Sequence, residues 1–258
     1  MSAEGLFSLK GRVALVTGGT RGIGRMIAEG LAAQGARVYI ASRKADEAAV
    51  DPKGLIALQA DVSSHAGIAG LAERFAQREP HLDILVNNAG VAWGAPLAEV
   101  DERSWDRVMA VNLKAPFFMT QAFLPALRRA SARGVKAKVI NIGSIDGIWV
   151  NPWDTYAYQA SKAGLQHLTR RLAAELIREG IVVNAIAPGA FPSDMNRAAR
   201  DREDAIAASI PAGRVGQAQD IAAAAIYLAS AGGDYVVGSV LAVDGGLVFA
   251  NPGAMPEA

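Results

Sequence analysis

Short uninterrupted apolar runs alternate along the chain with longer stretches in which apolar residues recur at helical spacing. The runs with the length and composition of buried strands are Val13–Thr17, Arg37–Ala41, Leu55–Ala60, Ile84–Asn87, Lys138–Ile142, Val182–Ala187 and Val240–Val243. The stretches with helical periodicity are Gly24–Gln34, Ile68–Glu79, Glu102–Arg129, Tyr156–Glu179 and Asp220–Ala229. Strands this apolar must be covered on both faces, so the pattern predicts a doubly wound parallel α/β sheet with right-handed crossovers.

Three stretches do not fit this alternation. Ala45–Lys53 could form a short helix in a shortened crossover, and the tail Asn251–Ala258 contains two prolines and a glycine. Ala190–Arg214 is too long for a plain connector and follows a strand end, where α/β sheets bind ligands, so we expect a substrate lid at about 190–214. With no linker, repeat or low-complexity tract, residues 1–258 are predicted to form one domain.

Composition narrows the class of protein. The chain has 258 residues, is 51% hydrophobic, and carries 26 basic and 25 acidic residues, a net charge of +1. Charges this balanced and interspersed do not suggest a nucleic-acid partner. There is no cysteine and there are three histidines, well separated, so we expect no disulfide and no metal site. No signal-peptide core or membrane-length apolar run is present, so we expect a soluble cytoplasmic protein without a membrane partner.

The most informative local motif is Thr17-Gly18-Gly19-Thr20-Arg21-Gly22-Ile23-Gly24, which follows a predicted strand and opens a predicted helix. Glycine permits a tight turn and lets the backbone approach a pyrophosphate, while the helix N-terminus offers free N–H groups and a positive dipole. In this strand–turn–helix context the motif predicts a dinucleotide site and a Rossmann fold of about seven strands.

The end of the second predicted strand indicates which nicotinamide cofactor is bound. An acidic residue there would bind the ribose 2′-hydroxyl of NAD, but the sequence reads Ala41-Ser42-Arg43-Lys44. Arg43 follows Ser42, and Arg21 lies inside the glycine motif. Because a 2′-phosphate suits bidentate arginine contacts, these residues predict NADP(H).

A second motif carries candidate chemistry. Tyr158 and Lys162 stand four residues apart on a predicted helix, so they share one face, and Ser144 lies upstream. The ammonium favours the phenolate, which should lower the tyrosine pKa toward the working pH and make it a usable general acid or base. Tyr156 lies on the same helix but has no lysine four residues on. Asp146 lies close to Ser144, but nothing in the pattern uses it, so it is interpreted as a polar loop residue.

These motifs resemble the short-chain dehydrogenase/reductase family over almost the whole chain. The matching segments occur in the family's order: Thr17–Gly24, Asp61-Val62, Asn87-Asn88-Ala89-Gly90, Asn112, Ser144, Tyr158 with Lys162, Pro188-Gly189 and Asp244-Gly245-Gly246. The resemblance implies an oxidoreductase acting on ketones or alcohols. It also implies a homotetramer, although the sequence does not decide between a dimer and a tetramer.

The resemblance implies a role for each matching residue. Asn112 would kink its helix and hold a water in a proton relay, Ser144 would polarise the substrate carbonyl, Tyr158 would transfer the proton, and Lys162 would also hold the nicotinamide ribose. Asp61 would bind the adenine amino group. With the residues above, the predicted cofactor site comprises Gly18, Thr20, Arg21, Gly22, Ile23, Gly24, Ser42, Arg43, Asp61, Val62, Asn88, Ala89, Gly90, Tyr158, Lys162, Pro188, Gly189 and Ser193.

The substrate is less well defined by the sequence. Asn141–Ser144 and Pro188–Met195 are similar to the NADPH-dependent 3-ketoacyl reductases linked to bacterial rhamnolipid synthesis, which favours an apolar ketone such as a 3-oxoacyl thioester. The residues expected to form a large apolar pocket are Trp93, Trp149, Trp153, Phe191 and Met195. Each tryptophan could instead belong to the core or to a subunit interface.

Two other functions remain open at this point. An NAD(P)-dependent dehydrogenase of polyols or cyclic alcohols would keep the same catalysis. A non-catalytic NADP(H)-binding regulator would keep the glycine motif, but such proteins tend to lose the tyrosine–lysine pair that this chain retains. The direction of the reaction is not set by the sequence, although NADP(H) favours reduction.

Overall fold

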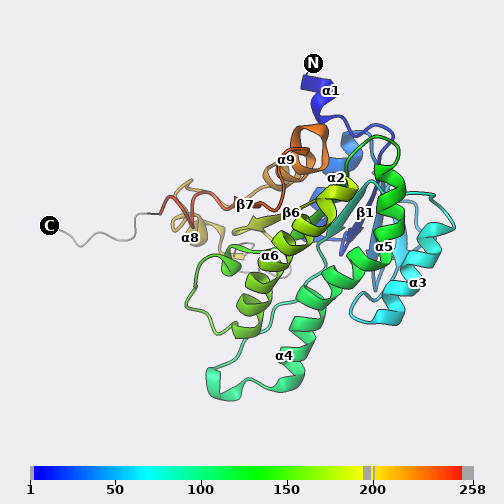
Figure 1. Ribbon diagram of the computed structural model, residues 1–258. Coiled ribbons are helices and arrows are strands. Elements are labelled where there is room, and N and C mark those ends of the chain that lie inside the picture. The colour runs from blue at the N-terminus through cyan, green and yellow to red at the C-terminus, as the bar shows by residue number, and fades with distance from the viewer. Residues whose placement is uncertain (1–2, 194–198, 200, 252–258) are drawn as a thin grey trace.

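The computed structural model describes residues 3–193, 199 and 201–251, and its centre is a sheet of parallel strands (Figure 1). The strands are β1 (Val13–Thr17), β2 (Arg37–Ser42), β3 (Ile56–Gln59), β4 (Ile84–Asn87), β5 (Ala137–Ile142), β6 (Ile181–Pro188) and β7 (Val240–Val243). Their order in the sheet is β3-β2-β1-β4-β5-β6-β7. Every predicted strand is present, with ends that differ by no more than one residue from the predicted ones.

Helix α1 precedes the first strand, and the other described α-helices lie in crossovers between strands. The α-helices are α1 (Ala3–Phe7), α2 (Gly22–Ala33), α3 (His65–Ala76), α4 (Glu102–Met109), α5 (Ala115–Ser131), α6 (Tyr156–Leu176), α8 (Glu203–Ala207) and α9 (Ala218–Ala229). Short 3₁₀ turns lie at η1 (Leu97–Glu99), η3 (Ile145–Gly147), η4 (Ile177–Glu179) and η5 (Ala231–Gly233). The short helix expected at Ala45–Lys53 is wrong, because this segment consists of turns and irregular backbone.

The helix predicted at Glu102–Arg129 is interrupted. Between α4 and α5 the backbone forms one π-helical segment, η2 (Ala110–Lys114), which contains Asn112. A π turn accommodates one extra residue in a helix and redirects the side chains around it, and such turns are frequent at functional sites. The kink expected at Asn112 therefore takes the form of a π turn.

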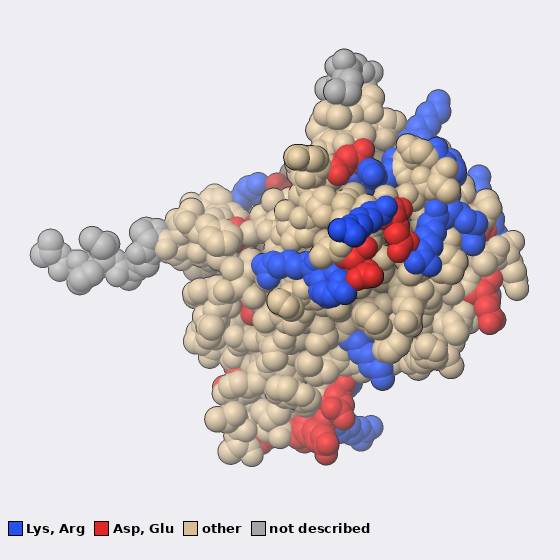
Figure 2. Space-filling view, viewed as in Figure 1, with Lys and Arg blue, Asp and Glu red and all other residues tan. Residues whose placement is uncertain are grey.

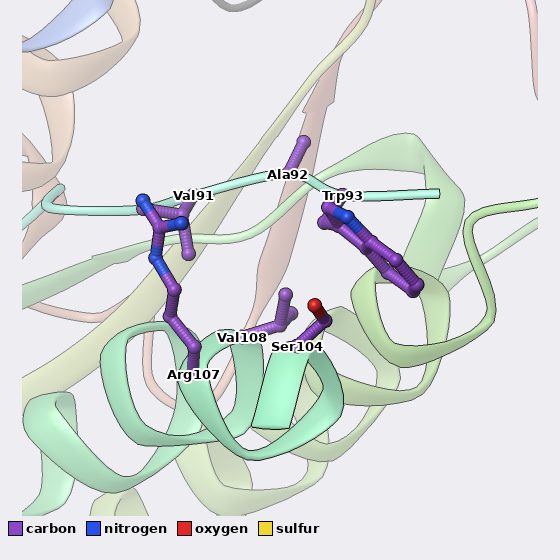
Figure 3. Close-up of a pocket in the computed structure, with 6 residues that line it drawn as sticks. All are labelled: Val91, Ala92, Trp93, Ser104, Arg107 and Val108. Carbon is purple, nitrogen blue, oxygen red and sulfur yellow. The ribbon is translucent and has the colours of Figure 1, made fainter. Parts of the chain in front are cut away.

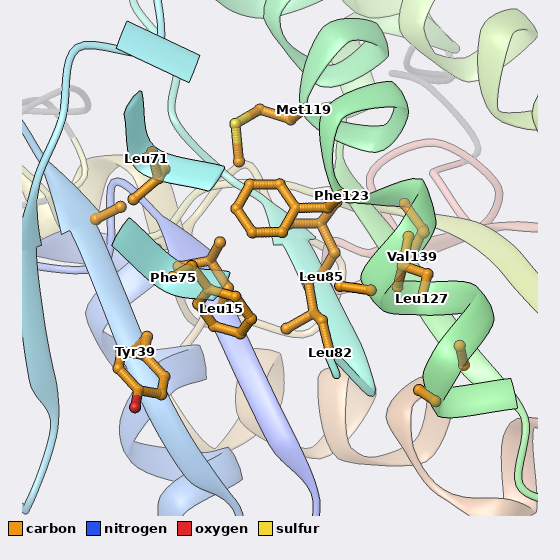
Figure 4. Close-up of a cluster of buried hydrophobic side chains, with 14 of the residues drawn as sticks. Leu15, Tyr39, Leu71, Phe75, Leu82, Leu85, Met119, Phe123, Leu127 and Val139 are labelled. Atoms are coloured by element: carbon orange, nitrogen blue, oxygen red, sulfur yellow. The ribbon is translucent and has the colours of Figure 1, made fainter. Parts of the chain in front are cut away.

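Apolar side chains pack on both faces of the sheet because successive residues of a strand point to opposite sides. Leu15 of β1 and Leu85 of β4 face α3, α5 and α6, where Phe75 and Phe123 complete one buried cluster (Figure 4). Their neighbours, among them Val16, face α2 and α9 and belong to a second cluster. The sheet is thus covered on both sides, as the unbroken apolar runs predict.

The surface carries charges of both signs. On the face drawn in Figure 2, acidic and basic side chains lie close to one another. Ion pairs at the surface of the protein include Arg171–Glu175 on α6 and Arg128–Glu179. Among the described residues, no helix is long and apolar enough to span a bilayer.

All strands are parallel, so their carboxyl ends lie along one edge of the sheet. The strand order reverses between β1 and β4, and ligands of open α/β sheets bind outside the strand ends at such a switch point. Beyond β6, the described part of 190–214 contains α8, and its Ala199 and Ile210 form a small buried cluster with Val215. The remainder, residues 194–198 and 200, lies outside the described residues.

Candidate active site

The glycine motif forms a tight turn between β1 and α2. Gly18 and Gly22 have positive φ angles of 65° and 55°, which residues with a side chain rarely adopt. A Cβ atom on Gly24 would lie 2.2 Å from Asn88 Nδ2 and 2.4 Å from the Gly18 carbonyl oxygen, so the packing requires glycine there. Helix α2 begins at Gly22, and its N-cap, Arg21, makes no side-chain capping bond. The start of a helix presents N–H groups and a positive dipole, which suit an anionic group.

The end of β4 is hydrogen-bonded to this turn. Asn88 Nδ2 donates to the carbonyl oxygens of Thr17, at 2.8 Å, and Gly18, at 3.2 Å. The Thr17 hydroxyl oxygen accepts from the N–H groups of Asn88 and Ala89, both at 3.0 Å. Thr17 is absent from the predicted site residues, although a hydroxyl on the last residue of a strand is a recognisable signal. These bonds hold the ends of β1 and β4 together at the switch point.

The residues expected at the adenine side lie at the ends of β2 and β3. Ser42 ends β2, and its hydroxyl lies 3.4 Å from that of Thr20 in the glycine motif. Arg43 follows, exposed, and its charge contributes to lowering the pKa of Asp61. The larger cause of that lower pKa is Ser63, whose hydroxyl and N–H both donate to Asp61 Oδ1. Val62 packs against the core beside Asp61.

The catalytic candidates converge beside β4 and β5. Helix α6 places Tyr158 and Lys162 on successive turns, with the Lys162 ammonium 5.6 Å from the Tyr158 ring centroid. Lys162 is 4% exposed, and its Nζ donates to the carbonyl oxygen of Ile142 at 2.8 Å. Ser144 is hydrogen-bonded to Tyr158, and its hydroxyl oxygen accepts from the Asp146 N–H at 3.2 Å. Because the bond to Ser144 lowers the Tyr158 pKa, Ser144 donates its hydroxyl hydrogen to the Tyr158 oxygen.

Asn112 connects these residues to the loop after β4. Its side chain accepts from the Val91 N–H and donates to the Val91 carbonyl oxygen, both at 2.9 Å, and its amide also donates to Ser161 Oγ at 3.1 Å. Asn112 is 1% exposed. The π turn therefore directs its amide onto the loop that begins with Gly90, between the glycine turn and the catalytic helix.

The pKa of Tyr158 is shifted upward, and not toward the working pH as expected from the sequence. Burial raises the pKa of Tyr158 to about 12, and the hydrogen bond from Ser144 only partly opposes this effect. Burial also lowers the pKa of Lys162 to about 8. Desolvation disfavours the charged form of both groups and is the largest cause of each shift. Tyr158 is thus a protonated phenol at neutral pH.

From the sequence, no role in the site was assigned to two residues near Ser144. Asp146 has its pKa raised by burial, while Asn151 and the charge of Lys162 act in the opposite direction. Its negative charge in turn raises the pKa values of Tyr158 and Lys162, so it is more than a polar loop residue. Gln166, one turn after Lys162 and 4% exposed, donates from Nε2 to the Ser144 carbonyl oxygen at 2.9 Å. Its spacing from Lys162 was the available signal.

Comparisons with known proteins agree with this arrangement. Residues 18–248 match the family model described as Enoyl-(Acyl carrier protein) reductase. The chain is 48% identical to the rhamnolipids biosynthesis 3-oxoacyl-(acyl-carrier-protein) reductase of Pseudomonas aeruginosa. The 249 aligned residues cover 93% of this chain and 97% of that protein. The chain belongs to the short-chain dehydrogenase/reductase family. It is also 39% identical to gluconate 5-dehydrogenase of Gluconobacter oxydans, over 96% of this chain and 98% of that one.

Solved structures of this family superpose closely. The RhlG/NADP active-site complex of Pseudomonas aeruginosa has a TM-score of 0.87 at 44% identity, covering 95% of this chain and 99% of that chain. A gluconate 5-dehydrogenase from Burkholderia cenocepacia in complex with NADP and tartrate has a TM-score of 0.86 at 39% identity, covering 95% and 98%. The predicted fold and the predicted oxidoreductase class are confirmed.

The strand-end segment after β6 is close to the glycine turn. A Cβ on Gly22 would lie 3.4 Å from Ser193 Cβ, so Ser193 is adjacent to the start of α2. A Cβ on Gly189 would lie 2.8 Å from the backbone of Asp244, so this packing leaves little room for a side chain at Gly189. Asp244 itself caps a turn by accepting from the N–H groups of Gly246 and Val248, both at 2.9 Å.

The aromatic residues expected around the substrate differ in their surroundings. Trp93 lines a small pocket (Figure 3). Ser104, Arg107 and Val108 of α4 line the same pocket. Trp149 and Trp153 are 46% and 59% exposed on the segment before α6.

Phe191 requires a correction. It is 2% exposed and belongs to the core cluster on the α2 and α9 face, where its ring packs against Gly216. A Cβ on Gly216 would lie 2.4 Å from that ring. Phe191 therefore anchors the start of the 190–214 segment in the core instead of presenting an apolar surface to a substrate. Met195 lies outside the described residues.

Proposed function

We propose that this short-chain dehydrogenase/reductase uses NADP(H) to interconvert a ketone and a secondary alcohol, with Ser144, Tyr158 and Lys162 as catalytic residues. The observation that carries the proposal is the convergence of Ser144, Tyr158 and Lys162 beside a glycine turn at the switch point of the sheet. A regulator without turnover would not need a phenol, a hydroxyl and a buried ammonium at one position.

The described residues fit an NADP(H) cofactor. The positive φ angles of Gly18 and Gly22, the close approach at Gly24 and the start of α2 at Gly22 suit a pyrophosphate. Ser42 and Arg43 stand at the end of β2, where a carboxylate would repel a 2′-phosphate. NADP is also the cofactor in the two similar complexes described above.

Replacement of Arg43 by aspartate should change the cofactor preference. The substitution removes a positive charge and adds a carboxylate that can bind a ribose hydroxyl, so kcat/KM for NADPH should fall about tenfold or more while NADH improves. Arg103→Asp, on the exposed surface of α4, is the matched control and should leave the ratio unchanged. Steady-state kinetics with both cofactors measures this, and equal efficiency of the unmodified protein with NADPH and NADH would refute the assignment.

The chain's residues divide the catalytic work. NADPH, when bound, supplies the hydride for reduction of the carbonyl carbon. The Ser144 hydroxyl donates a hydrogen bond to the carbonyl oxygen, and Tyr158, a neutral phenol, transfers its proton to the alkoxide that develops there. Lys162, held by the Ile142 carbonyl, places its positive charge beside Tyr158 and would also hold the cofactor ribose. Asn112 holds the Val91 backbone and is proposed to order a water that resupplies the proton.

Asp146→Asn should shift the pH dependence of catalysis. The Asp146 carboxylate raises the pKa values of Tyr158 and Lys162, so its removal should lower both. Because reduction needs both groups protonated, the alkaline limb of kcat/KM for reduction should move to lower pH, by less than about one unit. Oxidation needs the phenolate, so its rising limb should move the same way. Asp154→Asn, whose carboxylate bonds the exposed Tyr156 hydroxyl, is the control. Unmoved limbs would exclude this coupling.

We propose an apolar ketone, in particular a 3-oxoacyl thioester, as the substrate class. The support is the similarity to the Pseudomonas aeruginosa reductase and the exposed Trp149 and Trp153 before the catalytic helix. A polyol or sugar-acid dehydrogenase is the alternative, because gluconate 5-dehydrogenase is also similar. NADPH oxidation with 3-oxoacyl thioesters, cyclic ketones and keto-sugar acids tests the choice, and higher kcat/KM with a keto-sugar acid would favour the alternative.

We also propose a cytoplasmic homotetramer with a substrate lid at 190–214. Exposed apolar side chains, including Trp105 on α4, Phe117 on α5 and Tyr235 near β7, are unusual on a free surface and suit subunit contacts. Sedimentation at micromolar concentration measures the assembly, and a monomer would refute it.

For the proposed lid, hydrogen exchange in 190–214 should slow when NADPH and a substrate analogue are added together.

A further inference from the structure

The segment between β2 and β3, residues 43–55, is irregular but tightly held. We call it the β2–β3 loop. It begins with Arg43, the residue proposed to bind the 2′-phosphate of NADP(H), so its path determines where that guanidinium can lie. Its far end is anchored by Leu55, which is 4% exposed and part of the core. The part between these two residues has no regular secondary structure of its own.

One ion pair connects this loop to the helix behind the glycine turn. Both terminal nitrogens of the Arg25 guanidinium, on α2, donate to the Asp51 carboxylate. Nη1 donates to Oδ2, and Nη2 donates to Oδ1 at 3.1 Å. The side chains are 23% and 15% exposed, so the pair is partly shielded from water. Such a planar, bidentate pair fixes the orientation of both partners as well as their separation.

Both partners are held in place by further contacts. Arg25 Nε donates to Glu29 Oε1 at 2.6 Å, one helical turn away. Asp51 Oδ1 accepts from the Lys53 N–H at 2.8 Å, and the Asp51 carbonyl accepts from the N–H of Gly54, whose φ angle is 73°. Arg25 is thus already bonded to two carboxylates. Its charge is balanced by the protein, and it is poorly suited to bind a cofactor phosphate itself.

The start of the loop is held from the other side. Gln59 at the end of β3 donates from Nε2 to the Arg43 carbonyl oxygen at 3.0 Å. Glu47, in the middle of the loop, accepts from the Gln59 N–H at 2.8 Å and from Arg78 Nη2 at 3.2 Å. The backbone at Arg43 is therefore fixed by β3, while Asp51 fixes the returning half of the loop to α2.

We propose that Arg25 and Asp51 are positioning residues for recognition of the NADP(H) 2′-phosphate. Their ion pair ties the helix whose N-terminus is proposed to face the pyrophosphate to the loop that carries Arg43. The inference rests on the proposed cofactor site and deepens it. A rigid loop binds with a smaller loss of conformational entropy, so the pair should strengthen NADP(H) binding without touching the cofactor.

The test uses the 258-residue chain with Asp51→Asn, which removes the charge but keeps an oxygen for the Lys53 N–H. KM for NADPH should rise about fivefold, because a loosened loop forfeits part of a charge-assisted phosphate contact. The kcat with NADPH and the KM for NADH should change by less than about twofold, since neither depends on that contact. Asp51→Glu, which keeps the charge, should restore most of the NADPH affinity.

A charge swap and a control sharpen the result. The double variant Arg25→Asp/Asp51→Arg re-forms the pair in reverse, and its KM for NADPH should lie below that of either single variant. Glu175→Gln breaks an exposed ion pair on α6 and should change neither cofactor's KM. An unchanged KM for NADPH in Asp51→Asn would overturn the proposal, as would equal increases for NADPH and NADH, which would mean a purely structural role. If the unmodified protein showed no preference for NADPH, the Arg43 assignment itself would fail instead.

Discussion

Replacement of Tyr158 by phenylalanine should reduce kcat by about 100- to 10,000-fold, the range that a positioned general acid contributes. The ring and its place over Lys162 are kept, and only the hydroxyl bonded to Ser144 is lost. Cofactor affinity should therefore change little, which a fluorescence titration with NADPH measures alongside the steady-state rate. A loss confined to kcat identifies a group that acts in the transition state and not in binding.

Tyr156→Phe provides the matched control on the same helix. The Tyr156 hydroxyl bonds Asp154 Oδ1 at 3.0 Å, and the side chain is 37% exposed, so removal of that hydroxyl should cost less than about twofold in rate. If Tyr156→Phe were inactive and Tyr158→Phe active, the catalytic register along α6 would be wrong by half a turn.

The elements that the sequence predicts well are those governed by local rules. An uninterrupted apolar run such as Ile84–Asn87 has few structural alternatives, so the sheet and the motif positions at its strand ends follow from the pattern. The glycine turn is predictable for the same reason, because the positive φ angles at Gly18 and Gly22 leave little choice of residue.

The features that escaped prediction depend on contacts between distant segments. Phe191 looks like a pocket residue in a loop, but Gly216 leaves a space in the core that its ring fills. The spacing of Tyr158 and Lys162 suggests mutual attraction, but the sign of the pKa shift is set by how deeply the whole fold buries them. The Arg25–Asp51 pair likewise joins a helix to an irregular loop that has no sequence signature of its own.

Gly24→Ala should be the most damaging small substitution in the cofactor site. The added Cβ would lie 2.2 Å from Asn88 Nδ2 and 2.4 Å from the Gly18 carbonyl oxygen. Asn88 cannot move aside without losing its bonds to the Thr17 and Gly18 carbonyl oxygens. Overpacking of this kind costs about 1–3 kcal/mol, and the shift falls on the turn that is proposed to hold the pyrophosphate. We expect the Kd for NADPH to rise by up to about 100-fold, with a lower Tm.

Gly70→Ala separates this steric effect from the general effect of replacing a helical glycine. Gly70 lies within α3, and a Cβ there would meet only Arg74 Nη1, at 3.6 Å, an ordinary contact. Alanine is the better helix former by about 0.5–1 kcal/mol, so this control should raise Tm slightly and leave the Kd for NADPH unchanged. The two variants add the same methyl group and should move stability in opposite directions. If Gly24→Ala instead bound NADPH as tightly as the unmodified protein, the close contact between the glycine turn and Asn88 would not control cofactor binding.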